Sequence, residues 1–171
     1  MNESKCVMEK ESISFLGYLI SKEGVGPDPS LVQQILDVQP PTDNKELASF
    51  IGLVNFYGRF IKKISDKIFP LLELRKCKDE FTWLDIHQTA FDALKKDLAT
   101  APVVQLHDAS KELTVTTDAS EKSISAILSQ DSHPVLYLSR TLSKAETNYS
   151  NIEREALAIV WTTCRLLKGH K

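Results

Sequence analysis

Residues 113–120 read Leu-Thr-Val-Thr-Thr-Asp-Ala-Ser, which predicts a strand that ends at a carboxylate, Asp118. The β-branched residues before Asp118 fit the pleated surface of a strand, whereas aspartate is depleted inside strands. An aspartate at this position therefore indicates a turn, a cap, an ion pair or a metal site. Taken alone, the stretch favours a turn in which Ser120 completes a local hydrogen bond.

A second carboxylate makes a metal site a further candidate. Glu155 lies in the apolar-periodic run 152–161, which predicts a helix. Mg²⁺ prefers hard oxygen ligands such as carboxylates. Asp118 and Glu155 would supply two such side chains. The nearby Glu153 is assigned to a capping box with Ser150 instead.

Three motifs together form a family signature. They are Thr-Thr-Asp-Ala-Ser at 116–120, Leu-Tyr-Leu-Ser-Arg-Thr-Leu-Ser at 136–143, and Asn-Tyr-Ser-Asn-Ile-Glu-Arg-Glu-Ala-Leu-Ala-Ile-Val-Trp at 148–161. With them the chain resembles the start of the ribonuclease H domain of gypsy-type LTR-retrotransposon reverse transcriptases, and the resemblance extends upstream over nearly the whole chain. It implies that Asp118 and Glu155 are catalytic, help to hold two Mg²⁺ ions, and act on the RNA strand of an RNA–DNA hybrid.

The same resemblance implies that neither active site of the family is complete in this chain. The polymerase motif Tyr-x-Asp-Asp is absent, since the sequence contains no adjacent pair of aspartates. The ribonuclease H site takes two further aspartates from beyond the helix, and this sequence stops at residues 169–171, where the next strand would begin. We therefore expect a fragment of a Pol polyprotein that is inactive alone, and whether the chain is an enzyme stays open.

Composition gives little further guidance. The net charge of −2 provides no global nucleic-acid signal, so such binding must come from a local patch. The three cysteines are widely spaced, which argues against a disulfide framework or a zinc site and suits a reducing compartment. Neither a signal peptide nor an apolar run of ~20 residues is visible, which predicts no membrane partner and an intracellular location, cytoplasmic or nuclear.

Residues 1–27 are expected to be the end of a reverse transcriptase palm, in the form of a short β-ribbon. The phrase Phe-Leu-Gly-Tyr-Leu-Ile-Ser at 15–21 resembles the primer grip, which implies that Gly17 and Tyr18 contact nucleic acid. The alternative is an edge strand that contains a glycine. The run Gly-Val-Gly-Pro-Asp-Pro at 24–29 is expected to end the strand before it.

Residues 28–102 are expected to be thumb and linker helices. Asp28 is an N-cap signal for the first, either Thr42 or Asp43 can cap the second, and Asp85 is an N-cap signal for the last. The second helix has two apolar stripes, for which core packing is the favoured explanation. These stripes are Leu47, Phe50, Ile51, Val54 and Tyr57, and Leu53, Phe56 and Phe60.

The segment Arg59–Lys78 is the best local footprint for a phosphate backbone. It holds seven basic and two acidic residues, a net charge of +5, with aromatic residues interleaved. The alternative is a solvated basic face. The family usually has arginine where Gly58 stands, and a glycine inside a helix costs about 1 kcal/mol relative to alanine. The nucleic-acid-binding candidates of this region are Asn55, Tyr57, Arg59, Lys62 and Lys63.

Residues 103–171 are expected to be an incomplete ribonuclease H-like domain, with strands at 113–118, 124–130 and 134–139 and a helix at about 151–167. The family has glycines where Ser123 and Ser125 stand, so the first turn of this sheet is expected to differ. The predicted fold class is α+β: a short β-ribbon, a helical thumb-like bundle, and a truncated ribonuclease H-like mixed sheet with a covering helix.

Two functions are compatible with these features. The first is a fragment of a retrotransposon reverse transcriptase/ribonuclease H whose partner is an RNA–DNA hybrid or a template–primer duplex. The second is a domesticated or decayed module that binds nucleic acid or protein without catalysis, which the substitutions at Gly58, Ser123 and Ser125 favour. The sequence does not indicate an oligomeric state.

Overall fold

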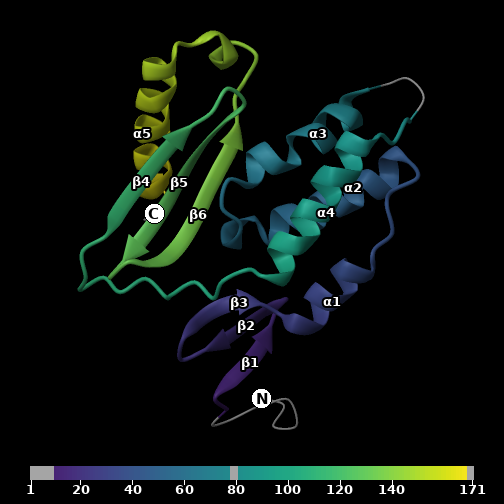
Figure 1. Cartoon of the computed structure of the whole chain (residues 1–171). Coiled ribbons are helices and arrows are strands. Elements are labelled where there is room, and N and C mark those ends of the chain that lie inside the picture. Colours follow the sequence, from purple (N-terminus) through teal and green to yellow (C-terminus); the bar gives the residue numbers. More distant parts are fainter. Residues whose placement is uncertain (1–9, 78–80, 169–171) are drawn as a thin grey trace.

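The computed structural model describes residues 10–77 and 81–168, arranged as a small sheet, a helical unit and a second sheet (Figure 1). The first sheet contains β1 (Ser12–Phe15), β2 (Tyr18–Ser21) and β3 (Gly24–Pro27). The helical unit contains α1 (Pro29–Asp37), α2 (Asn44–Phe56), the 3₁₀ helix η2 (Gly58–Phe60), α3 (Ile64–Lys76) and α4 (Asp85–Ala99). The second sheet contains β4 (Thr114–Ala119), β5 (Ser123–Gln130) and β6 (His133–Thr141), followed by the 3₁₀ helix η3 (Glu146–Asn148) and α5 (Asn151–Lys168). The α+β class expected from the sequence is confirmed.

The N-terminal ribbon is an antiparallel meander in the order β1–β2–β3. The run 24–29 was expected only to end a strand, but its first four residues form the third strand. Gly24 makes this possible, because it has φ of +140° and lies directly against the carbonyl of Val104. Val25 and Val104 exchange backbone hydrogen bonds of 2.8 and 2.9 Å, and Gln105 N–H donates to the carbonyl of Pro134 at 2.9 Å. The linker before β4 thus ties the ribbon to the start of β6.

The helical unit begins at the expected caps. Asp28 accepts a hydrogen bond from Ser30 N–H at the start of α1. Asp43 accepts from two backbone N–H groups of α2, and Glu46 reaches back to Thr42 N–H at 2.8 Å. Each cap satisfies donors that have no partner within the helix.

The cap of α4 differs from the prediction. Asp85 is the first residue of α4 rather than its N-cap, a position that Leu84 takes. Leucine has no side-chain acceptor, and the ring nitrogen Nδ1 of the buried His87 lies 3.0 Å from Leu84 N and accepts its hydrogen bond. This contact from the first turn of α4 fixes the chain at the helix start without a capping carboxylate.

One apolar core fills the helical unit, and the first stripe of α2 faces it. All five residues of that stripe are buried, which confirms the core-packing explanation. The second stripe divides: Phe60 is buried, whereas Phe56 is 45% exposed. Gly58 lies after the end of α2 and opens η2, so the helix-interior penalty expected for a glycine does not apply.

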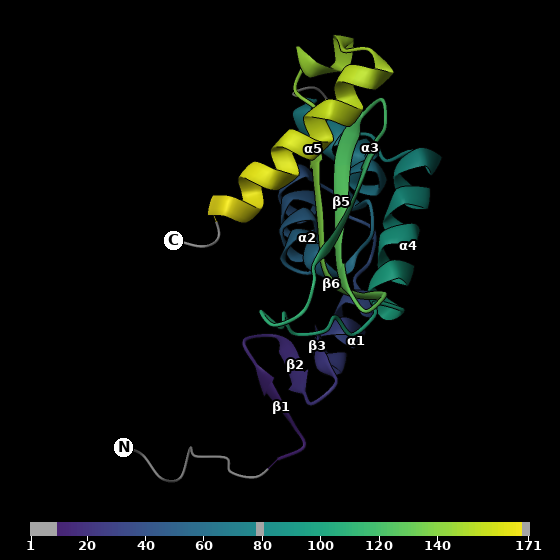
Figure 2. The ribbon, with the colours of Figure 1, turned by 90° about the vertical axis from the view of Figure 1, so that its left-hand side faces the viewer.

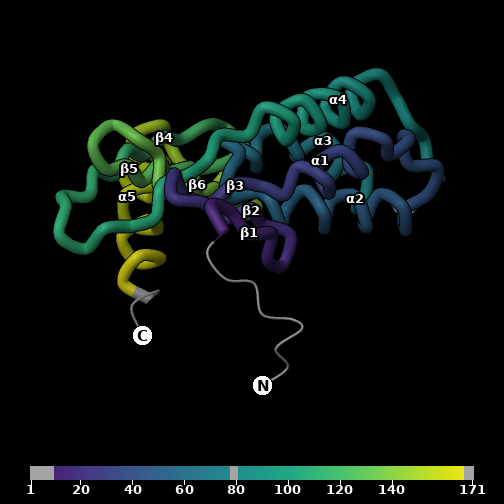
Figure 3. The backbone as a smooth tube through the Cα atoms, turned by 90° about the horizontal axis from the view of Figure 1, so that it is seen from below, coloured from purple at the N-terminus to yellow at the C-terminus, as the bar shows by residue number. Residues whose placement is uncertain are grey.

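The second sheet is antiparallel throughout, in the order β4–β5–β6, with a bulge at Leu128/Ser129. Helix α5 packs on β4 and β5, whereas α3 and η2 contact β5 and β6. Figure 2 shows the sheet between α5 and the helical unit. Figure 3, seen from below, shows β1–β3 in front, between the second sheet with α5 on one side and the helical unit on the other. Among the described residues, no helix is long and apolar enough to cross a membrane.

The turn between β4 and β5 forms without glycine. Ser120 and Ser123 close it, because Ser120 N–H donates to the Ser123 carbonyl at 2.8 Å and the Ser120 hydroxyl accepts from Ser123 N–H at 2.9 Å. Neither Ser123 nor Ser125 has a positive φ. The backbone here therefore does not need the glycines of the family, although the buried Ser123 hydroxyl has no partner among the described residues.

Helix α5 is anchored at its start and along one side. Ser150 and Glu153 form the expected capping box, with Ser150 N–H donating to Glu153 at 2.7 Å. Arg140 on β6 makes a bidentate ion pair with Glu146 of η3, at 2.8 Å for each contact, and its guanidinium lies 5.7 Å from the centre of the Trp161 ring. Arg140 thus links the sheet, the connection and the helix.

The close approach of Gly24 to the linker predicts a stability effect. Replacing Gly24 with alanine would place Cβ 2.2 Å from the Val104 carbonyl oxygen at an unfavourable φ, so Gly24→Ala should lower the free energy of unfolding by at least about 2 kcal/mol. Gly52→Ala is the control. Gly52 is exposed inside α2 with no atom within 4 Å of the new Cβ, so this change should stabilise by about 0.5–1 kcal/mol. Urea unfolding of both variants measures the difference, and equal stabilities would contradict the description of this bridge.

The Arg140–Glu146 pair predicts a pH dependence. Arg140 and the backbone of Ser143 hold the pKa of Glu146 at about 2, below its ordinary value of 4.5. Because the folded pKa is the lower one, this stabilisation is present above pH 4.5 and is lost as the pH falls toward 2; its upper limit is about 3 kcal/mol. Glu146→Gln should therefore destabilise at pH 7 and make the dependence of unfolding free energy on pH shallower between about pH 5 and 3. An unchanged dependence would show that the pair contributes nothing.

Candidate nucleic-acid interface and carboxylate pair

Three of the predicted nucleic-acid-binding residues meet at the junction of ribbon and helical unit. The Tyr57 hydroxyl donates to the Gly17 carbonyl at 3.1 Å. The Tyr18 ring stacks on Phe56, with centroids 5.0 Å apart and 15° between the planes, and the Tyr18 hydroxyl donates to the Phe56 carbonyl at 3.4 Å. The structure therefore brings Gly17, Tyr18 and Tyr57 together, with Tyr57 fully buried.

Packing explains the glycine at this junction. Gly17 has φ of +83°, and a Cβ there would lie 3.1 Å from the Phe56 ring and 3.3 Å from the Tyr57 hydroxyl oxygen. Burial raises the pKa of Tyr57, and the charge of Asp28 raises it further. Tyr57 consequently stays a neutral hydrogen-bond donor, which suits its contact with the Gly17 carbonyl.

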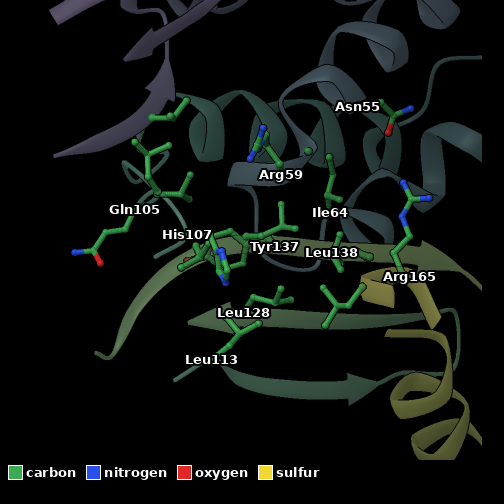
Figure 4. Close-up of a pocket in the computed structure, with 18 residues that line it drawn as sticks. Asn55, Arg59, Ile64, Gln105, His107, Leu113, Leu128, Tyr137, Leu138 and Arg165 are labelled. Atoms are coloured by element: carbon green, nitrogen blue, oxygen red, sulfur yellow. The ribbon is translucent and has the colours of Figure 1, made fainter. Parts of the chain in front are cut away.

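A cleft of about 1180 Å³ lies between the helical unit and the second sheet. Figure 4 shows Asn55 and Arg59 on its helical side, Tyr137 and Leu138 on β6, and Arg165 from α5. Asn55, Arg59 and Arg165 are exposed. Two guanidinium groups from distant parts of the sequence thus border one cleft, and Arg165 was not predicted because the α5 sequence gives no local signal for it.

Several lysines of the segment Arg59–Lys78 form ion pairs with acidic side chains, which its sequence does not reveal. Lys67 pairs with Asp97, Lys76 pairs with Glu73 at 2.6 Å, and Lys63 pairs with Asp118 at 2.7 Å. Lys78 lies outside the described residues. Arg59 and Lys62 are exposed and make no ion pair within 10–77 and 81–168, so they are the cations of this segment left for a phosphate backbone together with Arg75.

One of the two predicted catalytic carboxylates contacts a lysine. Asp118 is the penultimate residue of β4, and Glu155 lies in the second turn of α5. The Nζ of Lys63 is 2.7 Å from Asp118 Oδ2. The hydrogen bond to Asp118 raises the pKa of Lys63, and the charges of Asp118, Asp66 and Glu155 raise it further, against a smaller opposing effect of burial. Lys63 was predicted to contact nucleic acid, and the structure places it on this carboxylate cluster.

The first turn of α3 makes further contacts with the same end of the sheet. The Ser120 hydroxyl donates to Asp66 at 2.7 Å, and Ser65 N–H donates to the Ser139 hydroxyl at 3.2 Å. From the other side, Arg154 of α5 donates to the Ser120 carbonyl at 3.1 Å. The turn after Asp118 is therefore held between α3 and α5.

This donor set does not fit a magnesium ion. Mg²⁺ requires oxygen ligands in near-octahedral geometry and is poorly compatible with an adjacent ammonium group. Within the described ranges, no group of three or more His, Cys, Asp or Glu side chains is arranged to hold a metal ion. The position beside Asp118 is taken by the Lys63 ammonium instead.

The chain matches the family model described as the RNase H-like domain found in reverse transcriptase, over residues 83–168. It is 39% identical over 163 residues to the retrovirus-related Pol polyprotein from transposon 297 of Drosophila melanogaster, a match that covers 93% of this chain and 15% of that protein. It is 35% identical over 165 residues to the transposon Tf2-3 polyprotein of Schizosaccharomyces pombe, a match that covers 94% of this chain and 12% of that protein. The chain thus spans less than a sixth of the length of these relatives.

Solved structures with the same fold come from foamy viral protease-reverse transcriptase. The complex with double-stranded DNA has a TM-score of 0.83 at 23% identity and covers 93% of this chain and 34% of that chain. The complex with an RNA/DNA hybrid has a TM-score of 0.84 at 23% identity, and the match covers 92% of this chain and 22% of that chain. At this identity the likeness shows the fold, which includes the placement of the helical unit against the sheet.

Proposed function

Since the chain belongs to the family of RNase H-like domains found in reverse transcriptase, we propose that it is a Pol-derived segment that binds an RNA–DNA hybrid or a template–primer duplex and does not cleave it alone. The transposon Pol polyproteins of fly and fission yeast support the first part, because the similarity covers more than nine-tenths of this chain. An intracellular location, in the cytoplasm or the nucleus, is part of this proposal.

The finer assignment follows the motifs. We assign the chain to the gypsy-type lineage, with 1–27 as the end of the palm, 28–102 as thumb and linker, and 103–171 as the ribonuclease H-like part. The placement of Gly17, Tyr18 and Tyr57 supports a primer-grip and thumb junction, because these residues form one packed contact. In this assignment Gly17 and Tyr57 hold the protein backbone at the junction in place, and the exposed residues around them contact the nucleic acid.

The observation that carries the binding proposal is the set of exposed polar groups along the cleft. Asn55 at the end of α2 and Arg59 in η2 line the cleft on one side, and Arg165 lines it from α5. The exposed Lys62 follows η2 in the sequence. Guanidinium groups bind phosphate oxygens in two-point contacts, and such contacts give sequence-independent affinity. The foamy viral relatives of this fold were solved with double-stranded DNA and with an RNA/DNA hybrid, which suits the same class of ligand.

Binding through these cations should depend strongly on salt. We expect the described chain to bind a hybrid duplex without sequence preference, with an affinity that falls steeply between about 50 and 200 mM salt. The double variant Arg59→Ala/Lys62→Ala should lower the slope of log affinity against log salt by about two. Fluorescence anisotropy of a labelled hybrid measures this slope.

Lys76→Ala is the matched control, because Lys76 already pairs with Glu73. Its slope should stay close to that of the unaltered chain. If the double variant keeps the full slope, or if no binding occurs at low salt, the basic segment is a solvated face. In the same samples the RNA strand should stay intact with Mg²⁺ or Mn²⁺, and cleavage that disappears in Asp118→Asn would overturn the non-cleaving part.

An apolar patch supports a second candidate function, a protein-binding module. Ile159, Val160 and Leu167 on α5 are each more than half exposed, and Ile152 is 82% exposed. Between α5 and β4 lies a smaller groove of about 520 Å³, lined mainly by apolar side chains such as Val115 and Leu166. An exposed apolar surface of this kind is typical of a contact between protein segments.

A further inference from the structure

Lys63 connects the helical unit to an acidic side chain of the second sheet. Its ammonium contacts Asp118 of β4 at 2.7 Å, and it is also under the electrostatic influence of Asp66 of α3 and Glu155 of α5. Lys67, one turn later on α3, pairs with Asp97 of α4 and faces the helical unit. Lys63 is thus a cation that the helical unit directs at Asp118 of the sheet.

The backbone at Lys63 is unusual for a residue with a side chain. Lys63 has φ of 54° and ψ of 38° at the N-cap of α3, a left-handed conformation that favours glycine. Strained residues of this kind persist when surrounding contacts hold them, and they are common at functional sites. The contacts are present here, because Ser65 and Asp66, the second and third residues after Lys63, bond to Ser139 and Ser120 of the sheet.

The neighbouring Lys62 carries the same charge as Lys63 but does not pair with Asp118. Lys62 is exposed and makes no ion pair in the described part of the chain, whereas Lys63, one residue later, contacts Asp118. A right-handed residue at 63 would direct the chain differently into α3. The left-handed turn is therefore what delivers one specific ammonium group to the carboxylates.

We infer that Lys63 is a built-in cation that occupies the position beside Asp118 in place of a divalent metal ion while the helical unit is docked on the sheet. This role goes beyond nucleic-acid binding and does not depend on it. The ammonium balances the charge of Asp118, and it does so from an element outside the ribonuclease H-like sheet. Asp118 consequently serves as a docking contact, and divalent cations are kept away from it.

Binding of Mn²⁺, followed by the relaxation of water protons, tests this inference on the full chain. The unaltered chain should bind no more Mn²⁺ than its Asp118→Asn variant does. Lys63→Gly should bind Mn²⁺ at least about tenfold more tightly than the unaltered chain does, because the repulsion between the ammonium and the metal ion is removed. Glycine also adopts the left-handed φ without strain, so this variant retains the turn into α3.

Lys62→Gly is the matched control, with the same loss of charge one residue away, and should gain no site. Adding Asp118→Asn to Lys63→Gly should abolish the gained site, which would place the metal on this cluster. Binding of Mn²⁺ by the unaltered chain that depends on Asp118 would overturn the inference. So would a Lys63→Gly variant that stays folded by circular dichroism and gains no site.

Discussion

The first turn of α3 meets the sheet through an ion pair, two hydrogen bonds and a strained backbone residue, and this contact lies where the helical unit docks on the sheet. Lys63 pairs with Asp118, Ser65 bonds to Ser139, and Asp66 accepts from Ser120. The exposed fractions of the Lys63 and Asp118 side chains are 39% and 46%, so their attraction is worth at most about 1 kcal/mol. A left-handed lysine costs about 1–3 kcal/mol. The ion pair alone therefore does not offset the strain, and the apolar packing of α3 and η2 on β5 and β6 supplies the remainder.

This contact also determines what the carboxylates can do. The Lys63 ammonium is already beside Asp118, so this carboxylate forms part of the contact between the helical unit and the sheet. The same docking forms the cleft that Asn55, Arg59 and Arg165 border. The docking of the two parts and the position of the exposed cations Arg59 and Arg165 thus belong to one arrangement of side chains.

The sequence predicted the local features well and the long-range contacts poorly. Caps such as Asp28, Asp43 and Ser150 were predictable because the signal and its target lie within a few residues of each other. Strand β3 was missed because its glycines are turn signals, and only the Val104 carbonyl, eighty residues away in the sequence, explains why Gly24 must approach so closely. Likewise, the pairing of Lys63 with Asp118 joins residues that no periodicity connects. The basic segment was predictable as a charge pattern, but which of its cations are free depends on partners such as Asp97 on other elements.

Hydrogen exchange of the unaltered chain and of Lys63→Met tests most directly whether this contact couples the two parts. If the docking depends on it, the variant should lose amide protection both at the start of α3 and across residues 116–126 of the sheet, while residues 47–54 of α2 keep theirs. A loss confined to residues 62–66, or no loss at all, would show that the sheet and the helical unit are held together independently of Lys63, and the account of this structure would be contradicted.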